Sequence, residues 1–154
     1  MTGEEQRALF RRWPAGVSVV VAESGARRAG LTVSSLVSLS LEPPLVSISL
    51  GRSALLYEPL HEAGRWSVSI LAAGQARLAQ HFARNVPPIA LWDGIAVRED
   101  DPLLLAGAIG WIRARTVDEF AAGDHVIFVG AIDSVESGPG QGSLVYVDRR
   151  YVEL

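Results

Sequence analysis

Short hydroxyl side chains recur along the segment from residue 30 to residue 50, GLTVSSLVSLSLEPPLVSISL. A solvent-facing strand usually carries long charged side chains, which discourage edge pairing, yet Glu42 is the only charged residue in this segment. Hydroxyls close to the backbone can bind a polyhydroxylated or phosphorylated ligand that lies flat against them. They can also bond to carbonyls inside a buried sheet, the commoner use of side-chain hydrogen bonds. The hydroxyl residues are Thr32, Ser34, Ser35, Ser38, Ser40, Ser47 and Ser49.

Arg52 and Ser53 follow this segment directly. The next residues are typical of a short helix over residues 53–61, for which Ser53 is the predicted N-cap. The free N–H groups of a helix N-terminus attract a phosphate, and a guanidinium adds bidentate donors. The order of these groups therefore suits a phosphate that carries a polyol and a ring.

His125 follows Gly123 and Asp124 and begins an apolar run. On its own, a histidine at a strand end most often bonds to a carbonyl oxygen. His61 and His81 fall in short helical segments, and their spacing with each other and with His125 fits no metal motif. We therefore predict no metal site.

The composition restricts the possible chemistry. The chain contains no cysteine, which excludes disulfides, thiolate nucleophiles and cysteine-ligated metals. All 14 basic residues are arginine, so neither a Schiff-base lysine nor a P-loop lysine is available. A ligand of this chain is therefore held without covalent attachment to either group.

Length and charge indicate one globular domain over residues 1–154. An apolar content of 49% suggests a subunit interface, and a net charge of −3 argues against a nucleic-acid-binding face. We expect a cytoplasmic protein, because the sequence shows neither a membrane-spanning apolar run nor a signal sequence.

The hydrophobic pattern predicts short strands, few helices and no βαβ alternation, which favours an antiparallel barrel over a Rossmann sheet. Thr2 and Glu5 form a capping box for a helix that ends near Arg12. The loop over residues 83–93 is either a lid or a subunit contact, and the glycines of residues 138–142 form a turn rather than a dinucleotide fingerprint. Strands are expected at residues 17–23, 31–40, 45–50, 66–70, 103–117, 125–135 and 144–147, and a further helix at residues 75–82.

Three stretches resemble the flavin reductase family: WPAGVSVVVAE at residues 13–23, GLTVSSLVSLSLEPPL at residues 30–45 and GDHVIFVGAI at residues 123–132. The resemblance runs from Phe10 to Leu154. It implies a mainly β fold, an antiparallel Greek-key split β-barrel with a few short helices, known as the FMN-binding split barrel. It also implies a homodimer that uses NAD(P)H to reduce FMN or FAD and delivers the reduced flavin to a separate monooxygenase.

The resemblance assigns a role to each candidate site residue. The segment from Thr32 through Val33 and Ser34 to Ser35 would bind the pyrimidine edge and the ribityl chain of the flavin. His125 would hold the nicotinamide near the flavin rather than move a proton, since hydride transfer depends mainly on orientation. Arg52 and Ser53 would bind the flavin phosphate, and Tyr151 would lie on the nicotinamide side. Phe82 would lie near the flavin, although a core aromatic is an equally good interpretation of this residue.

Three departures from the family pattern leave alternatives open. Ala15 replaces a common threonine, Ser34 replaces a frequent asparagine, and YVDRRY at residues 146–151 replaces a segment that resembles His-Arg-Gly-Arg. The last departure favours an alternative function, a flavin-binding carrier, sensor or accessory subunit without significant reductase activity. A split-barrel oxidase that uses a deazaflavin or pyridoxine phosphate is a third possibility.

Overall fold

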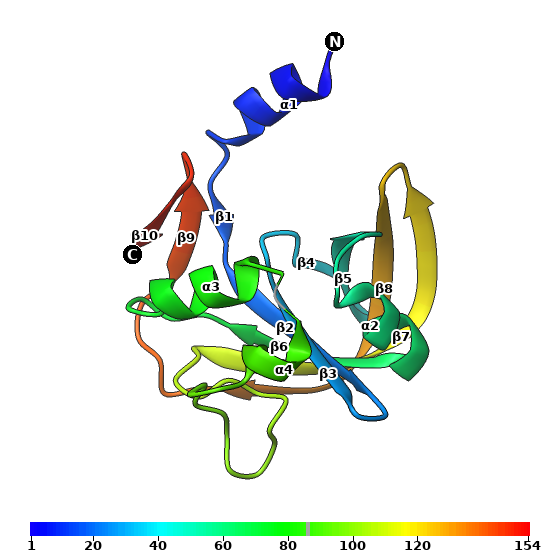
Figure 1. Ribbon diagram of the computed structural model, residues 1–154, viewed down its shortest axis with the longest axis vertical. Helices are drawn as coiled ribbons and strands as arrows, with labels where there is room; N and C mark the ends of the chain where they lie inside the picture. The colour runs from blue at the N-terminus through cyan, green and yellow to red at the C-terminus, as the bar shows by residue number, and fades with distance from the viewer. Residues whose placement is uncertain (86) are drawn as a thin grey trace.

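The computed structural model describes residues 1–85 and 87–154, and antiparallel strands form most of its regular structure (Figure 1). The strands of the described residues form a sheet of seven in the order β3-β2-β6-β7-β8-β5-β4 and a sheet of three in the order β1-β9-β10. The seven are β2 (Ser18–Ser24), β3 (Arg27–Val33), β4 (Val37–Leu41), β5 (Pro44–Gly51), β6 (Arg65–Ile70), β7 (Gly110–Ala122) and β8 (His125–Ser137). The three are β1 (Ala15–Gly16), β9 (Leu144–Val147) and β10 (Arg150–Glu153), and the helices are α1 (Gly3–Phe10), α2 (Tyr57–Ala63), α3 (Ala76–Ala83) and α4 (Pro88–Leu91).

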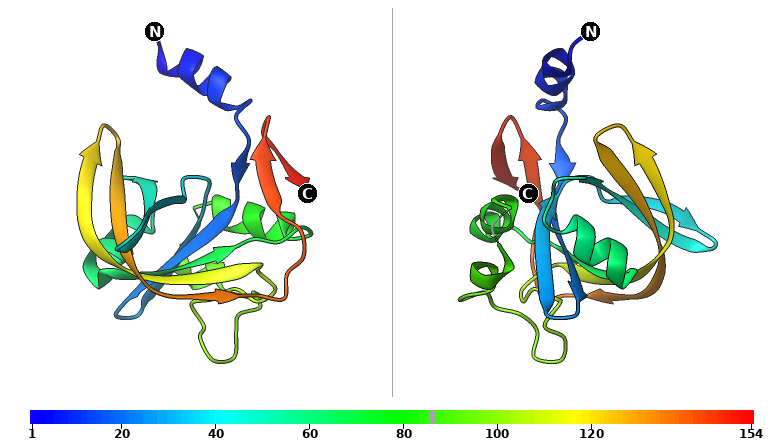
Figure 2. Two further views of the ribbon diagram at one scale, coloured as in Figure 1. Left: turned by 180° about the vertical axis from the view of Figure 1, so that it is seen from behind. Right: turned by 45° about the vertical axis from the view of Figure 1, so that its right-hand side comes forward.

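The larger sheet curls into an open barrel. Its two outer strands, β3 and β4, are joined by residues 34–36 alone, so the sheet must bend to bring its ends together. The long β7–β8 hairpin supplies the bend, because its register shifts twice, after Arg113 and after Thr116, and such bulges bend strands. Figure 2 shows this hairpin curving round the sheet. The predicted antiparallel, mainly β fold with a few short helices is confirmed.

The core fills the barrel and extends behind it. Inside, Trp66, Ile48 and Phe128 are almost wholly buried with Leu60 of α2. On the other face of β2, a second cluster packs α3 and α4 against the sheet, with Phe82 fully buried in it. Apolar burial on this scale supplies most of the stability of such a domain.

Helix α1 lies apart from both sheets (Figures 1 and 2). The predicted capping box is present, since Thr2 N–H donates to Glu5 and Glu5 N–H donates to Thr2 Oγ1. None of its residues is buried. The apolar side chains at its end, Leu9, Phe10 and the following Trp13, are 68%, 60% and 69% exposed.

The predicted N-cap at Ser53 is wrong. Helix α2 begins only at Tyr57, and its N-cap, Leu56, makes no side-chain capping bond. Ser53 lies instead in a turn, where Ala54 N–H donates to Gly51 O at 3.0 Å. The physical reason is a contact with the turn before β8, because Arg52 N–H donates to Asp124 O at 3.0 Å and directs the chain away from helical geometry.

Other predicted boundaries also need correction. Strand 31–40 is interrupted at residues 34–36, and the last residues of the predicted strand 103–117 belong to β7, which begins at Gly110. The loop predicted at residues 83–93 contains α4, and Val86 lies outside the described residues. None of the helices described here has the length and apolarity needed to cross a membrane.

Candidate functional site

Two hollows lie on either side of residues 32–34, at the end of β3. They have volumes of about 290 Å³ and 220 Å³ and share Thr32, Val33 and Ser34 in their linings. The larger one is also lined by Leu31, Ser35, Ser49, Leu50, Gly51 and His125. The smaller one is also lined by Val17, Ala83, Tyr146 and Tyr151. The structure thus brings the predicted hydroxyl segment together with His125 on one side and Tyr151 on the other.

The hydroxyl groups of this segment have different surroundings. Thr32 Oγ1 donates to Ala79 O at 2.6 Å, and Ser35 Oγ donates to Ser49 O at 3.0 Å while accepting from Ser49 N–H at 3.0 Å. Ser34 is exposed, and its hydroxyl makes no hydrogen bond to any described residue. Thr32 and Ser35 therefore fix the backbone, whereas Ser34 faces solvent with its hydroxyl available to a ligand.

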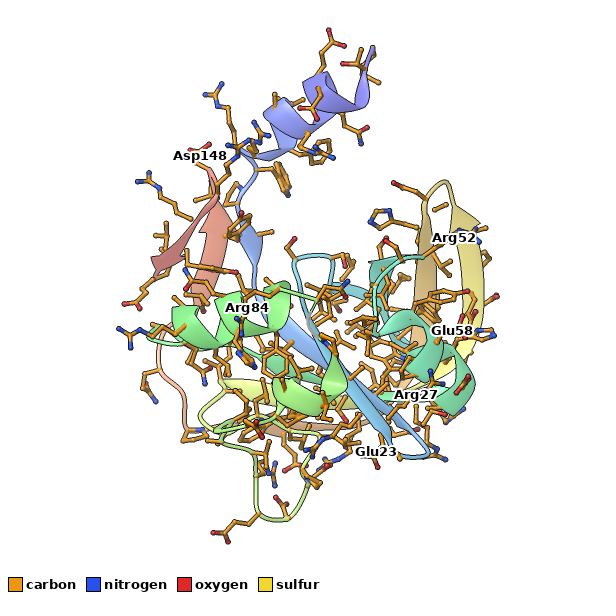
Figure 3. All side chains as sticks on the ribbon, viewed as in Figure 1. Glu23, Arg27, Arg52, Glu58, Arg84 and Asp148 are labelled. Carbon is orange, nitrogen blue, oxygen red and sulfur yellow. The ribbon has the colours of Figure 1, made fainter. Side chains whose placement is uncertain are left out.

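The turn after β5 presents open hydrogen-bond donors. Arg52 is exposed and forms no ion pair with the described residues, and Figure 3 labels it beside the β7–β8 hairpin. Neither Ser53 N–H nor Ser53 Oγ has a partner among the residues that the structure describes. A guanidinium, a hydroxyl and a free N–H at one turn match the needs of a phosphate. The anion site stays a prediction, and its residues lie on a turn and not on a helix N-terminus.

His125 stands opposite Gly51 in the β5–β8 pairing. Its Nδ1–H donates to the Asp124 carboxylate at 2.8 Å, and this bond lowers the pKa of Asp124. A carboxylate only accepts hydrogen bonds, so the proton lies on Nδ1 and leaves Nε2 as an acceptor. Gly51 keeps the space before the ring open, since a Cβ there would lie 3.8 Å from Nε2.

Two tyrosines face each other across β9 and β10 at the smaller hollow. The ring centroids of Tyr146 and Tyr151 are 5.1 Å apart, and burial together with Tyr146 raises the pKa of Tyr151. Tyr146 was not predicted as a site residue. The pairing of Tyr146 with Tyr151 would have identified it, but β10 was not predicted.

Phe82 is not brought to either hollow. Its ring is 0% exposed and packs edge-on against His81 and Trp92. Gly30 makes room for it, because a Cβ at that position would lie 2.8 Å from Phe82 Cε1. This placement favours the core interpretation of Phe82 over a direct ligand contact.

The other histidines have structural partners. His81 Nε2 donates to Leu91 O at 2.6 Å, and His81 Nδ1 accepts from Arg84. His61 bonds to Glu119 and stacks on Tyr57. Within residues 1–85 and 87–154, no group of three acidic or histidine side chains is arranged to hold a metal ion.

The sequence matches the family described as "Flavin reductase like domain" over residues 10–154. The reductase component of 4-hydroxyphenylacetate 3-monooxygenase from Thermus thermophilus is 38% identical over 151 residues, which cover 98% of this chain and 96% of that protein.

Two solved structures are also similar. BorF, the flavin reductase component of a bacterial two-component tryptophan halogenase, superposes with a TM-score of 0.88 at 31% identity over 99% of this chain and 98% of its own. The NADH:FAD oxidoreductase SgcE6 of Streptomyces globisporus, in complex with NAD and FAD fragments, superposes with a TM-score of 0.88 at 30% identity over 98% of this chain and 92% of its own.

Proposed function

Because this chain belongs to the flavin reductase-like domain family, we propose that it is an NAD(P)H:flavin oxidoreductase that reduces FMN or FAD. When bound, the nicotinamide would supply a hydride from its C4, and the flavin would take up that hydride at N5 together with a proton. The observation that carries the proposal is that the hydroxyl segment and His125 line one hollow of this family fold together with Gly51, the residue directly before the Arg52–Ser53 turn.

The residues at the larger hollow fit a flavin mononucleotide. Ser34 and the backbone of Val33, which line this hollow, would bond to the polar edge of the ring and the ribityl chain. Arg52 and Ser53 would bind the phosphate with donors that have no partner in the described part of the chain. The walls contributed by Leu31 and Leu50 are apolar and suit the flat ring.

The residues beside the two hollows would position the nicotinamide. His125 Nε2 would accept a hydrogen bond from the dinucleotide, with the ring orientation set by Asp124. Tyr151 and Tyr146 would form an aromatic wall on the other side. Holding C4 of the nicotinamide close to N5 of the flavin is the main contribution that the protein makes to such a reaction.

The reduced flavin is proposed to leave for a separate enzyme. The Thermus relative is named as the reductase component of a monooxygenase, and BorF as that of a halogenase. The larger hollow opens to solvent, as the 48% exposure of the His125 side chain illustrates. We therefore propose that flavin exchanges as a substrate that serves a partner monooxygenase.

We also propose that residues 1–154 act as one flavin reductase-like domain in a cytoplasmic homodimer. The exposed apolar end of α1, at Leu9, Phe10 and Trp13, supports a subunit contact. The edge strand β4 adds Val37, Leu39 and Leu41, which are 51%, 46% and 89% exposed. Apolar surface of this kind marks interaction sites in soluble proteins.

An anaerobic titration tests the reductase. Purified protein is mixed with FMN or FAD, NADH and then NADPH are added, and the flavin absorbance is followed. We expect rapid bleaching of the oxidised flavin band with at least one nucleotide. Nucleotide oxidation that does not depend on added flavin would contradict the proposal.

The β9–β10 hairpin favours one alternative. Asp148 and Arg149 form its turn with positive φ angles of 49° and 63°, where the family commonly has a glycine-containing segment. If this change removes the nucleotide contact, the protein is a flavin carrier, sensor or accessory subunit. Flavin that binds but is bleached by neither nucleotide would establish that alternative.

A further inference from the structure

The side chain of Asn85 joins the end of α3 to the turn that carries Arg52 and Ser53. Leu55 N–H donates to Asn85 Oδ1 at 2.9 Å. Asn85 lies two residues after Ala83, the last residue of α3, and Leu55 lies two residues after Ser53. One hydrogen bond thus connects the segment that follows α3 to the turn that follows β5.

The backbone at this position suits asparagine. Asn85 has a φ of 50°, in the left-handed region that asparagine and glycine enter more readily than other residues. The same residue therefore ends the helical path of α3 and points an amide oxygen at Leu55. Alanine would lose the acceptor and would fit this φ less well.

Helix α3 is itself held firmly against the ligand-facing strand. Thr32 Oγ1 donates to Ala79 O at 2.6 Å, and the buried Phe82 ring packs where Gly30 has no side chain. These contacts fix α3, and with it Asn85, relative to β3. The hydrogen bond from Leu55 N–H to Asn85 in turn fixes the turn after β5 relative to α3.

The turn needs this second attachment. Its first half is fixed by Arg52 N–H, which donates to Asp124 O, and by Ala54 N–H, which donates to Gly51 O. Leu55 N–H is the next donor along the chain, and its acceptor is Asn85. Ser53, whose N–H is open to a ligand in the described structure, lies between these attachments.

We infer that Asn85 is a positioning residue for the flavin phosphate: it holds the Arg52–Ser53 turn at a fixed distance from the hydroxyl segment of residues 32–35. The inference rests on the proposed function, because it requires the phosphate at Arg52 and Ser53. Asn85 acts through the turn and needs no contact with the flavin. Its loss affects a flavin that has a phosphate and spares one that has none.

Asn85→Gly tests the side chain apart from the backbone conformation, since glycine adopts the positive φ readily while the side chain and its acceptor are removed. Binding of FMN and of riboflavin is measured by titration of flavin fluorescence. We expect FMN to bind roughly 3- to 10-fold more weakly to the variant, the range of one lost hydrogen bond. Riboflavin, which lacks the phosphate, should change by less than about twofold on the same basis.

A double-mutant cycle with Arg52→Gln shows whether the effect passes through the turn. In the Arg52→Gln background, Asn85→Gly should cause little further loss of FMN affinity. Arg77→Ala is the control, because Arg77 is exposed on the same helix and makes no hydrogen bond to the described residues. It should leave both affinities unchanged.

The outcomes distinguish this inference from the proposed function. Equal loss of FMN and riboflavin affinity, or no loss of either, would overturn the positioning role and leave the reductase standing. So would wild-type protein that binds FMN and riboflavin equally well. Wild-type protein that binds neither flavin would overturn both.

Discussion

At the scale of single residues, the site combines groups that fix the backbone with groups left open to a ligand. The hydroxyls of Thr32 and Ser35 donate hydrogen bonds to carbonyl oxygens. The side chains of Ser34, Ser53 and Arg52 make no such bond to the residues described. Because Thr32 and Ser35 hold the backbone in place before a ligand arrives, less conformational entropy is lost when the ligand binds. The fixed residues thus preorganise the open ones.

His125→Ala should slow flavin reduction without weakening flavin binding, because its imidazole orients the nicotinamide and not the flavin. Loss of one such contact predicts a fall of about tenfold in kcat/KM for the nucleotide, equivalent to about 1.4 kcal/mol. Stopped-flow reduction at several NADH concentrations measures it.

His61→Ala is the matched control for that variant, since His61 is a half-exposed histidine bonded to Glu119 away from both hollows. It should reduce flavin at the wild-type rate. Equal slowing in both variants would contradict the nicotinamide role of His125.

At the scale of elements, the bent β7–β8 hairpin decides where the site lies. Its curvature carries β5 and the Arg52–Ser53 turn round toward β3. Trp66 supports the bend from inside, because its indole lies against the bare backbone of Gly130 on β8. Any side chain at Gly130 would press directly on that ring.

Gly130→Ala should therefore destabilise the protein by about 1–3 kcal/mol, the cost of overpacking a filled core. Gly16→Ala, at a strand glycine with no atom within 4 Å of the added Cβ, should be nearly neutral. Urea unfolding of the two variants gives the comparison. Equal stability would show that the Trp66 ring moves aside without cost.

An ion-pair network ties residues 98–101 to β7 and β8. Glu136 bonds to both Arg113 and Arg98, and Arg98 also pairs with Asp100 and lies over Trp111. The bonds from these guanidiniums lower the pKa of Glu136 and that of Asp100. The carboxylates thus favour the folded state only while they are ionised.

The sign of the pH effect follows from those lowered pKa values. The stabilisation is complete above 4.5, the ordinary pKa of a glutamate, and is lost as the pH falls through the lower value in the folded protein. Glu136→Gln should be less stable than wild type at neutral pH and should lose less stability on acidification. Thermal melts across this range test the prediction, with the exposed Glu99→Gln as a control that changes neither.

How far the sequence predicts this structure depends on how local each cause is. The capping box of α1, the apolar runs of β2 and β8 and the apolar alternation of β6 each depend on a few neighbouring residues, and the sequence predicts each of them near its observed place. Ser53 was misplaced because its turn depends on Asp124, a residue far along the chain. Strand β10 was missed because an Asp-Arg pair forms its turn where glycine or asparagine is the usual sign of a hairpin.

At the scale of the whole molecule, α1 is the part that the rest of the chain does not cover. The residue after it, Arg11, is tied to the turn between β9 and β10, where Asp148 N–H donates to Arg11 O at 2.6 Å. Its apolar end is exposed, and this is the surface that supports the proposed homodimer. A helix with no buried residue is marginal by itself and gains stability from packing against a partner.

Trp13→Glu should therefore shift the protein toward the monomer, because it places a charge in the proposed contact. Sedimentation velocity over a range of protein concentrations measures the change. Val135→Glu is the control, as Val135 is a 66% exposed apolar residue on β8, outside α1, β4 and the segment of residues 83–93. A wild-type protein that sediments as a monomer would contradict the proposal.

The pairing of Gly51 with His125 also bears on the stage of folding at which the site forms. These residues are 74 positions apart in the sequence, and they become neighbours only when β5 pairs with β8. Contacts between distant segments slow folding and form late. A partly folded chain consequently has no flavin site, so flavin binds the native state alone and raises its stability by mass action. A cell short of flavin would therefore hold this protein closer to its unfolding threshold, where proteases remove it.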